Sequence, residues 1–101
     1  PNYSNYYIRA EFKVKIQEYQ KALDDLNESI SISSAIEGLG DEINGEAYLK
    51  RGYLKNKFLG DTKGACLDWE NSKRIFNIYD FSDYQQDEKN EVESYLKKFC
   101  N

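Results

Sequence analysis

One pattern of small and large residues occurs twice in this chain, once in each half. Ala22 is followed by Leu26 and Ser29 at the fourth and seventh positions, and the same spacing recurs with Ala65, Trp69 and Ser72. Residues at these intervals lie on one face of an α-helix. The sequence shows no sustained alternation of apolar and polar residues, which is the mark of a β-strand. It therefore predicts an all-α fold built from two similar halves.

The chain is expected to contain five helices and no sheet. A short turn at Gln17 and Glu18 places the first two helices antiparallel, and three glycines between residues 36 and 45 indicate a loop. Asp61 is a candidate cap for the fourth helix. An irregular link is expected at 77–80, and Ser82 to Gln85 has the form of a capping box. The expected helices cover residues 4–16, 19–36, 46–59, 62–76 and 82–99.

Length and charge limit the class of protein. With 101 residues the chain is one small domain, residues 1–101, and at that size folding buries about two-thirds of the unfolded chain's surface. A net charge of −4 lacks the basic footprint of a duplex-binding domain, so nucleic acid is not an expected partner. The longest uncharged stretch, residues 29–36, is far shorter than the roughly 20 apolar residues of a membrane span. We expect a soluble domain with no membrane partner.

The residue types present argue against most catalytic chemistry. The chain has no His, which is the commonest general base and metal ligand. Its only thiols, Cys66 and Cys100, are too few and too far apart for a zinc cluster. Acidic pairs such as Asp24 and Asp25 lack the spacing of a calcium loop and are expected to lie on a solvated face. The sequence therefore predicts no enzyme activity, no metal and no cofactor.

The repeated pattern resembles the tetratricopeptide signature. In that family a helix–turn–helix unit of about 34 residues carries small residues that let its two helices approach closely and a bulky residue that fills the gap between them. Leu59 to Asp61 also resembles the family's Gly-Asp turn between helices. The resemblance implies packing roles for Tyr6, Ala10, Ala22, Leu26 and Ser29 in the first unit and for Tyr48, Gly52, Ala65, Trp69 and Ser72 in the second.

The resemblance implies an α-solenoid of two antiparallel helix pairs with a fifth helix as a cap. Repeat one covers about 3–36, a loop 37–45, repeat two 46–76 and the capping helix 82–100. Ala65 lies 43 residues after Ala22, so about nine residues beyond the family's spacing are expected in the second helix and its loop. Two repeats are fewer than the roughly three that make a stable solenoid. The fifth helix is therefore expected to cover the open end.

The family's general role implies a protein-interaction module. Its members bind a peptide or protein segment on the concave surface formed by the first helix of each pair. A two-carboxylate clamp of the family is disfavoured, because Tyr7 and Glu11 stand at its places. A merely solvated face is the competing interpretation of the remaining residues. The predicted binding residues are Tyr7, Glu11, Val14, Lys15, Lys50, Tyr53, Asn56 and Lys57.

A second interpretation of the chain is structural. The apolar N-terminal edge, with Tyr3 and Tyr6, and the segment 75–81 are candidates for self-association. The chain is then a homo-oligomer or part of a longer solenoid, without a peptide groove. Light scattering separates the two interpretations, because a peptide receptor remains monomeric and an assembly element forms a stable dimer.

Cys66 and Cys100 leave two alternatives open. A bridge between them joins the capping helix to the last repeat and closes a loop of about 35 residues, worth roughly 3–4 kcal/mol. Two free thiols suit a reducing compartment equally well. The bridged form indicates an exported or periplasmic protein, and the free form indicates a cytoplasmic one.

Overall fold

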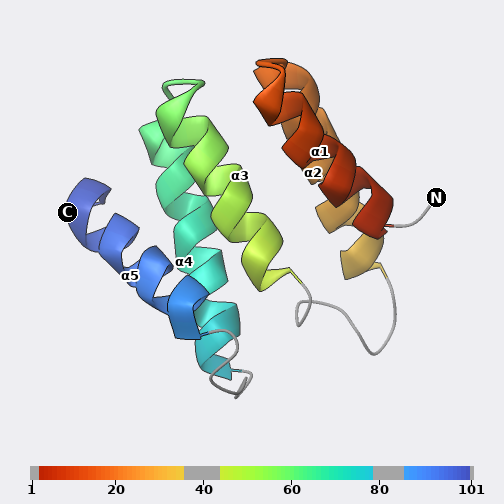
Figure 1. Ribbon diagram of the computed structural model, residues 1–101. Helices are drawn as coiled ribbons and strands as arrows, with labels where there is room; N and C mark the ends of the chain where they lie inside the picture. Colours follow the sequence, from red (N-terminus) through yellow and green to blue (C-terminus); the bar gives the residue numbers. More distant parts are fainter. Residues whose placement is uncertain (1–2, 36–43, 79–85, 101) are drawn as a thin grey trace.

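The structure is a computed structural model that describes residues 3–35, 44–78 and 86–100. These ranges contain five α-helices and no β-strand, which confirms the prediction of an all-α chain. Figure 1 shows the helices side by side, with α1 and α5 on opposite sides of the molecule. The helices are α1 (Tyr3–Lys15), α2 (Tyr19–Ser34), α3 (Gly45–Lys57), α4 (Thr62–Ile78) and α5 (Gln86–Phe99).

The helices pack against one another in chain order (Figure 1). α1 lies against α2, and α3 lies against α4; we call these pair one and pair two. α2 contacts α3 and so joins the pairs, while α5 packs on α4 at the far side of pair two. Short turns at residues 16–18 and 58–61 make the two helices of each pair antiparallel.

Each pair has an apolar core of its own. In pair one, Ala10, Ala22 and Leu26 are buried together with Leu54, which α3 contributes across the junction. The core of pair two also draws on α5, since two of its buried residues come from that helix. It consists of Leu49, Ala65, Trp69 and Phe76 with Val92 and Leu96 of α5.

The turns inside the two pairs share one backbone geometry. Gly60 has a φ of 68° and Gln17 a φ of 65°, the left-handed conformation in which many helices end. Glycine adopts this conformation without strain, whereas the Cβ of glutamine disfavours it. After the second turn, Asp61 Oδ1 accepts a 2.8 Å hydrogen bond from the Gly64 backbone N–H. This confirms Asp61 as the cap of α4.

Three predicted helix ends are wrong by two residues, those of α2, α3 and α4. α3 ends at Lys57 rather than at residue 59. α2 ends at Ser34 rather than at residue 36. Next to this end, the Ser33 hydroxyl has one proton and lies within hydrogen-bond distance of two acceptors, the Ile30 carbonyl oxygen and Asn44 Oδ1. α2 has 16 residues and α4 has 17, so the extra spacing between the repeats does not lengthen α2. α4 continues to Ile78, which makes 77–78 helical instead of an irregular link. The predicted loop at 37–43 and capping box at 82–85 lie outside the described residues.

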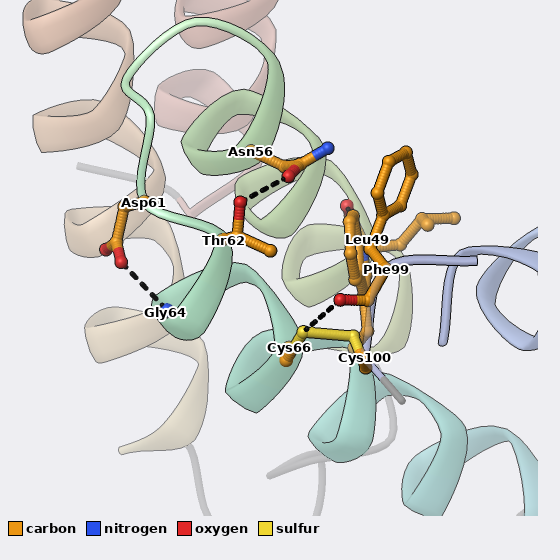
Figure 2. Close-up of a disulfide and its surroundings, with 9 residues drawn as sticks. Leu49, Asn56, Asp61, Thr62, Gly64, Cys66, Phe99 and Cys100 are labelled. Carbon is orange, nitrogen blue, oxygen red and sulfur yellow. Dashed lines mark hydrogen bonds between the residues drawn. A yellow bond between two sulfur atoms is a disulfide. The ribbon is translucent and has the colours of Figure 1, made fainter. Parts of the chain in front are cut away.

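A disulfide joins α4 to the residue after α5 (Figure 2). Cys66 and Cys100 are bonded through their Sγ atoms, with Cα atoms 5.8 Å apart. Cys66 Sγ also lies 3.8 Å from the carbonyl oxygen of Phe99. Because a disulfide sulfur carries no proton, this is a van der Waals contact and not a hydrogen bond. The Trp69 ring packs against Tyr95 and Phe99, with centroids 4.9 and 5.9 Å apart. α5 is thus held both covalently and by aromatic packing.

Candidate functional site

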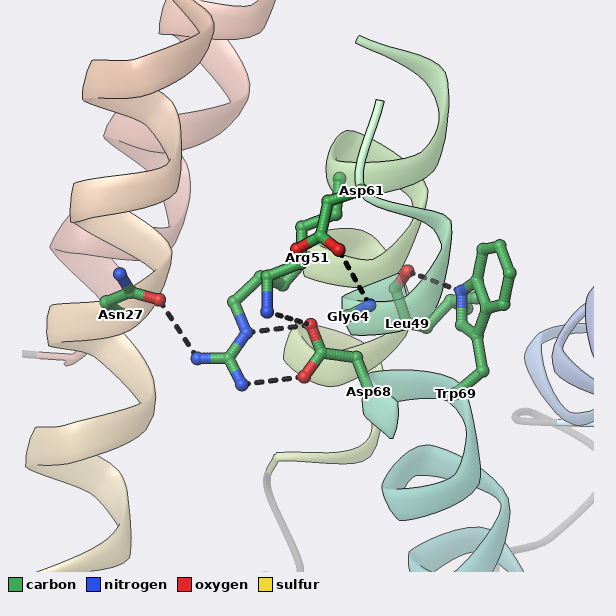
Figure 3. A network of polar contacts seen from close by, with 8 residues as sticks. Asn27, Leu49, Arg51, Asp61, Gly64, Asp68 and Trp69 are labelled. Carbon is green, nitrogen blue, oxygen red and sulfur yellow. Dashed lines mark hydrogen bonds and ion pairs between the residues drawn. The ribbon is translucent and has the colours of Figure 1, made fainter. Parts of the chain in front are cut away.

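Pair two contains a buried ion cluster that the sequence patterns did not reveal (Figure 3). The Asp68 side chain on α4 is 3% exposed and accepts hydrogen bonds of 2.9 Å from Arg51 Nε and 2.7 Å from Arg51 Nη2. Lys55 Nζ lies 3.1 Å from the same carboxylate. The Arg51 guanidinium also lies 5.3 Å from the centre of the Tyr48 ring. This bidentate ion pair holds α3 and α4 together in a defined orientation.

Pair one repeats this cluster at the corresponding positions. Arg9 donates to the Asp25 carboxylate at 3.0 and 2.7 Å, and Lys13 Nζ lies 2.8 Å from it. The guanidinium lies 5.1 Å from the centre of the Tyr6 ring. The expectation that Asp25 is solvated is therefore wrong: its side chain is 5% exposed, and the two cations from α1 compensate its burial. Hydrogen bonds from Arg9 hold the pKa of Asp25 below its ordinary value, against the opposing effect of burial.

The packing residues meet where the helices of each pair cross. Trp69 is fully buried, and its Nε1–H donates to the Leu49 carbonyl oxygen at 3.3 Å. A Cβ on Gly52 would lie 2.5 Å from Trp69 Nε1, so a side chain at this position collides with the indole. Pair one instead combines Ala10 with the smaller Leu26 in one cluster. Of the other residues with predicted packing roles, Ala22, Ser29, Ala65 and Ser72 are buried, and Tyr6 and Tyr48 are half-buried.

A pocket of about 210 Å³ lies between α1 and α3, and we call it the α1–α3 groove. The buried side chains of Ala10, Leu26 and Leu54 contribute its apolar floor. Phe58 adds a further apolar surface at the end of α3. Five of the eight predicted binding residues complete the lining, namely Glu11, Val14, Lys15, Lys50 and Tyr53.

The groove combines this apolar floor with charged groups on both of its helices. Lys15 belongs to α1 and Lys50 to α3, so cationic side chains line the groove from two sides. The Tyr53 ring meets the Phe58 ring edge-on, with centroids 6.2 Å apart. An extended peptide can place an apolar side chain on the floor while its carboxylates or carbonyl oxygens approach the two lysines.

Three predicted binding residues lie outside the lining of the groove. Tyr7 Oη donates a 2.9 Å hydrogen bond to Glu46 Oε1 and thereby ties α1 to the start of α3. Burial, followed by the Glu46 charge, raises the pKa of Tyr7 far above its ordinary value, so the phenol stays a neutral donor. Asn56 Oδ1 accepts a 2.9 Å hydrogen bond from the Thr62 hydroxyl. Lys57 Nζ donates at 2.9 Å to the Tyr53 hydroxyl, next to the groove.

A second pocket, of about 460 Å³, lies between α4 and α5. Charged side chains of both signs, together with Leu96 and Cys100, line it, and it lacks the apolar floor of the α1–α3 groove. Across residues 3–35, 44–78 and 86–100, no cluster of His, Cys, Asp or Glu is suited to hold a metal ion. Within the same ranges, no helix has the length and apolar character needed to cross a bilayer.

Part of the surface predicted for self-association is buried. Ile75 and Phe76 are buried in pair two, so they are not available for an intermolecular contact. Residues 79–81 and the Tyr3 side chain lie outside what the structure describes. Ile78 of the same segment is 60% exposed, and Ile8, Phe12 and Ile16 form a further exposed apolar surface on α1 and the turn after it.

The duplicated ion cluster is the feature that sequence reasoning missed. The signal was present, because Arg9, Lys13 and Asp25 each have an identical residue 42 or 43 positions later. Charged residues were interpreted as a solvated surface, whereas the same repeat that marks the packing residues also marks these ions.

Comparison with known proteins identifies no relative of this chain. No protein-family model matches it, and neither a curated protein nor a solved structure matches it. Its function is therefore inferred from its own residues and geometry.

Proposed function

We propose that this chain is a protein-interaction module of the tetratricopeptide-repeat type, which binds an extended peptide segment in the α1–α3 groove. The observation that carries the proposal is the pocket between α1 and α3, lined by five residues that the repeat pattern singles out. The duplicated ion cluster supports the repeat assignment, because Arg, Lys, Asp and Tyr recur at equivalent positions in both pairs. A scaffold of two equivalent pairs presents its first helices, α1 and α3, to the same ligand.

The size of the groove favours one peptide side chain over a free small molecule. Small-molecule pockets usually enclose about 300–1,000 Å³, whereas the α1–α3 groove measures about 210 Å³. A Leu or Phe side chain of the bound segment occupies the floor. Lys15 and Lys50 attract acidic groups on either side of it. The preferred segment therefore has an apolar residue flanked by Asp or Glu.

The proposed role is binding without catalysis. The chain has no His to act as a general base, and the groove is lined by apolar and charged side chains suited to recognition. The proposal requires neither a cofactor nor a metal.

Selection of random short peptides displayed on phage tests the proposed function. We expect enrichment of peptides with an apolar residue beside acidic ones. The double variant Lys15→Glu/Lys50→Glu should bind an enriched peptide at least about tenfold more weakly, because it reverses the charge around the floor. The matched control is Lys21→Glu/Lys63→Glu, which makes the same charge change at exposed lysines outside the groove lining.

Two results contradict the proposed function. The first is equal weakening of peptide binding by the groove variant and its control. The second is enrichment of the same peptides on the Val14→Trp variant, because the indole ring replaces a small side chain in the lining and should fill the groove.

We also infer that the chain works in an oxidising compartment. The Cys66–Cys100 bridge supports this, because such bonds persist in secreted and periplasmic proteins and are rare in the reducing cytosol. Intact mass of the protein, purified without reductant, should rise by two hydrogen masses on reduction. An unchanged mass contradicts the bridge and the compartment together.

A further inference from the structure

The outer side of α1 carries an exposed apolar ridge. Ile8, Phe12 and the residue that follows the helix, Ile16, are 63%, 59% and 48% exposed. The three residues are spaced four apart, so they form a single row along the helix surface. We call this row the α1 ridge. None of its members lines the α1–α3 groove, so the two surfaces are separate.

The internal repeat identifies the counterpart of this ridge. The two ion clusters align Arg9 of α1 with Arg51 of α3, because both residues grip a buried Asp and lie over a Tyr ring. The same alignment equates Ile8, Phe12 and Ile16 with Lys50, Leu54 and Phe58.

On α3, two of the three corresponding residues, Leu54 and Phe58, pack against α2 of the preceding pair, while Lys50 lines the α1–α3 groove. Leu54, the counterpart of Phe12, is 2% exposed and packs in one cluster with Leu26 of α2. Phe58, at the C-terminal end of α3, stacks on Tyr19 of α2 with ring centroids 4.1 Å apart. The existing α2–α3 interface therefore shows how a row of this kind is buried.

A polar contact accompanies the apolar ones in that interface. Arg51 Nη1 donates a 2.9 Å hydrogen bond to Asn27 Oδ1 of α2, and Figure 3 shows the guanidinium bridging from Asp68 to α2. The Arg51 side chain is 18% exposed, whereas its counterpart Arg9 is 55% exposed. A second helix lying on the α1 ridge would bring an oxygen acceptor to Arg9 as α2 does to Arg51.

A second copy of the chain does not offer a suitable helix face. The face of α2 that carries Tyr19 and Leu26 is covered by α3. Its counterpart on α4 is covered by α5, which the disulfide to Cys66 holds in place. Neither α2 nor α4 of a second copy can therefore supply the helix that occupies the α1 ridge.

We propose that the α1 ridge binds a helix of a partner protein whose exposed face has the chemistry of α2. That face carries an aromatic residue to lie on Ile16 and, two turns later, a leucine to lie on Phe12. Beside the leucine it carries an amide or carboxylate oxygen that accepts a hydrogen bond from Arg9. The bound helix extends the packing order seen between α2 and α3 by one helix. The proposal is independent of the peptide groove.

A tethered helix of this chemistry provides the test. A chain carrying an additional copy of residues 3–44 directly before Tyr3 places an α2 helix beside the α1 ridge at high local concentration. In this extended chain, Phe12→Ser at the original position should lower the midpoint of thermal unfolding by roughly 5–10 °C, because it then removes a buried ring. In the unextended chain, the same variant should shift the midpoint by about 1 °C or less.

Two further variants keep the test decisive. Leu67→Ser, at a residue 67% exposed on α4, should be nearly neutral in both chains. Phe12→Leu places the residue of the α3 counterpart on the ridge and should retain the stability of the extended chain. An equal effect of Phe12→Ser in both chains overturns the proposal. So does dimerisation of the unextended chain that Phe12→Ser abolishes, because the ridge then belongs to a second copy.

Discussion

Size complementarity at single residues sets the distance between the helices of each pair. Gly52 faces Trp69 in pair two, and a Cβ at this position would lie 2.8 Å from Trp69 Cδ1. Pair one solves the same packing problem with Ala10 and Leu26, a larger residue on one side and a smaller one on the other. The small and the large residue of a pair can therefore be exchanged only together, not one at a time.

Gly52→Ala tests this complementarity, because its effect on the free energy of unfolding should depend on the residue at position 69. In the natural chain it should lower the free energy of unfolding by about 1–3 kcal/mol, because the methyl group overlaps the indole of Trp69. In a Trp69→Leu background it should be neutral or stabilising by up to about 1 kcal/mol, since alanine is the better helix former. Urea unfolding measures both effects. An equal loss in the two backgrounds contradicts the packing described for pair two.

Gln17 holds a strained backbone conformation that glycine relieves. Its φ of 65° matches that of Gly60 in the equivalent turn. Gln17→Gly should therefore raise the free energy of unfolding by about 0.5–1 kcal/mol. Gln20→Gly, in the first turn of α2, should instead lower it, because glycine is a poorer helix former than glutamine. Destabilisation by both changes, measured by urea unfolding, argues against the left-handed turn.

Asp25 makes the free energy of unfolding depend on pH in the acidic range. Arg9 holds its pKa below the ordinary value, so the stabilisation is complete above the unfolded pKa of about 3.9 and is lost as pH falls through the lower folded pKa. Asp25→Asn should lower the free energy of unfolding at neutral pH by about 1–3 kcal/mol and flatten its decline below about pH 4. Asp24→Asn, on the exposed side of α2, is the control. Parallel pH profiles for Asp25→Asn and the natural chain contradict this role.

Among the elements, α5 depends most on a long-range bond. It supplies Val92 and Leu96 to the core of pair two, and Cys100 anchors its end to α4. Cys66→Ser/Cys100→Ser should lower the free energy of unfolding by about 3–4 kcal/mol, because the loop of 34 residues is no longer closed. Loosening of α5 also admits water to Trp69, so its fluorescence emission should shift to longer wavelength.

Reductant supplies the control for the disulfide. Reductant should lower the free energy of unfolding of the natural chain and shift its Trp69 emission as the double serine variant does. It should leave the double serine variant itself unaffected. Identical unfolding curves for the natural chain with and without reductant contradict the anchoring of α5 by this bond.

The number of helices and the cap at Asp61 were predictable because both depend on local sequence. Apolar spacing marks a helix, and an Asp before a helix marks its start. The extension of α4 to Ile78 was not predictable in this way, because it depends on Phe76 in the last turn, which is buried in a core that α3 and α5 complete. Tertiary packing, rather than local preference, sets that boundary.

The groove was predicted only in part for a related reason. The repeat pattern indicated which face of α1 and α3 to consider, and Lys15 and Lys50 do line the groove. It did not reveal that Tyr7 and Asn56 are held by Glu46 and Thr62, because those hydrogen bonds join separate helices. Asp25 was misjudged for the same reason, since its cations come from α1.

At the scale of the whole molecule, the two ends of the helix array differ. α5 lies at one end and α1 at the other (Figure 1). α5 covers pair two and is fixed by a disulfide, whereas the α1 ridge is exposed. α1 thus has two distinct surfaces, one lining the groove with α3 and one facing away from the array. We propose that the first binds an extended segment and the second a helix, and the two proposals together predict that the molecule holds two different partners at once.

The central claim, that ligand binds between α1 and α3, is tested most directly by mapping backbone amide shifts when an enriched peptide is added. We predict the largest changes at Glu11, Val14, Lys15, Lys50 and Tyr53, which line the groove, and little change along α5. Largest changes around Glu70 and Leu96, in the pocket between α4 and α5, would contradict the account.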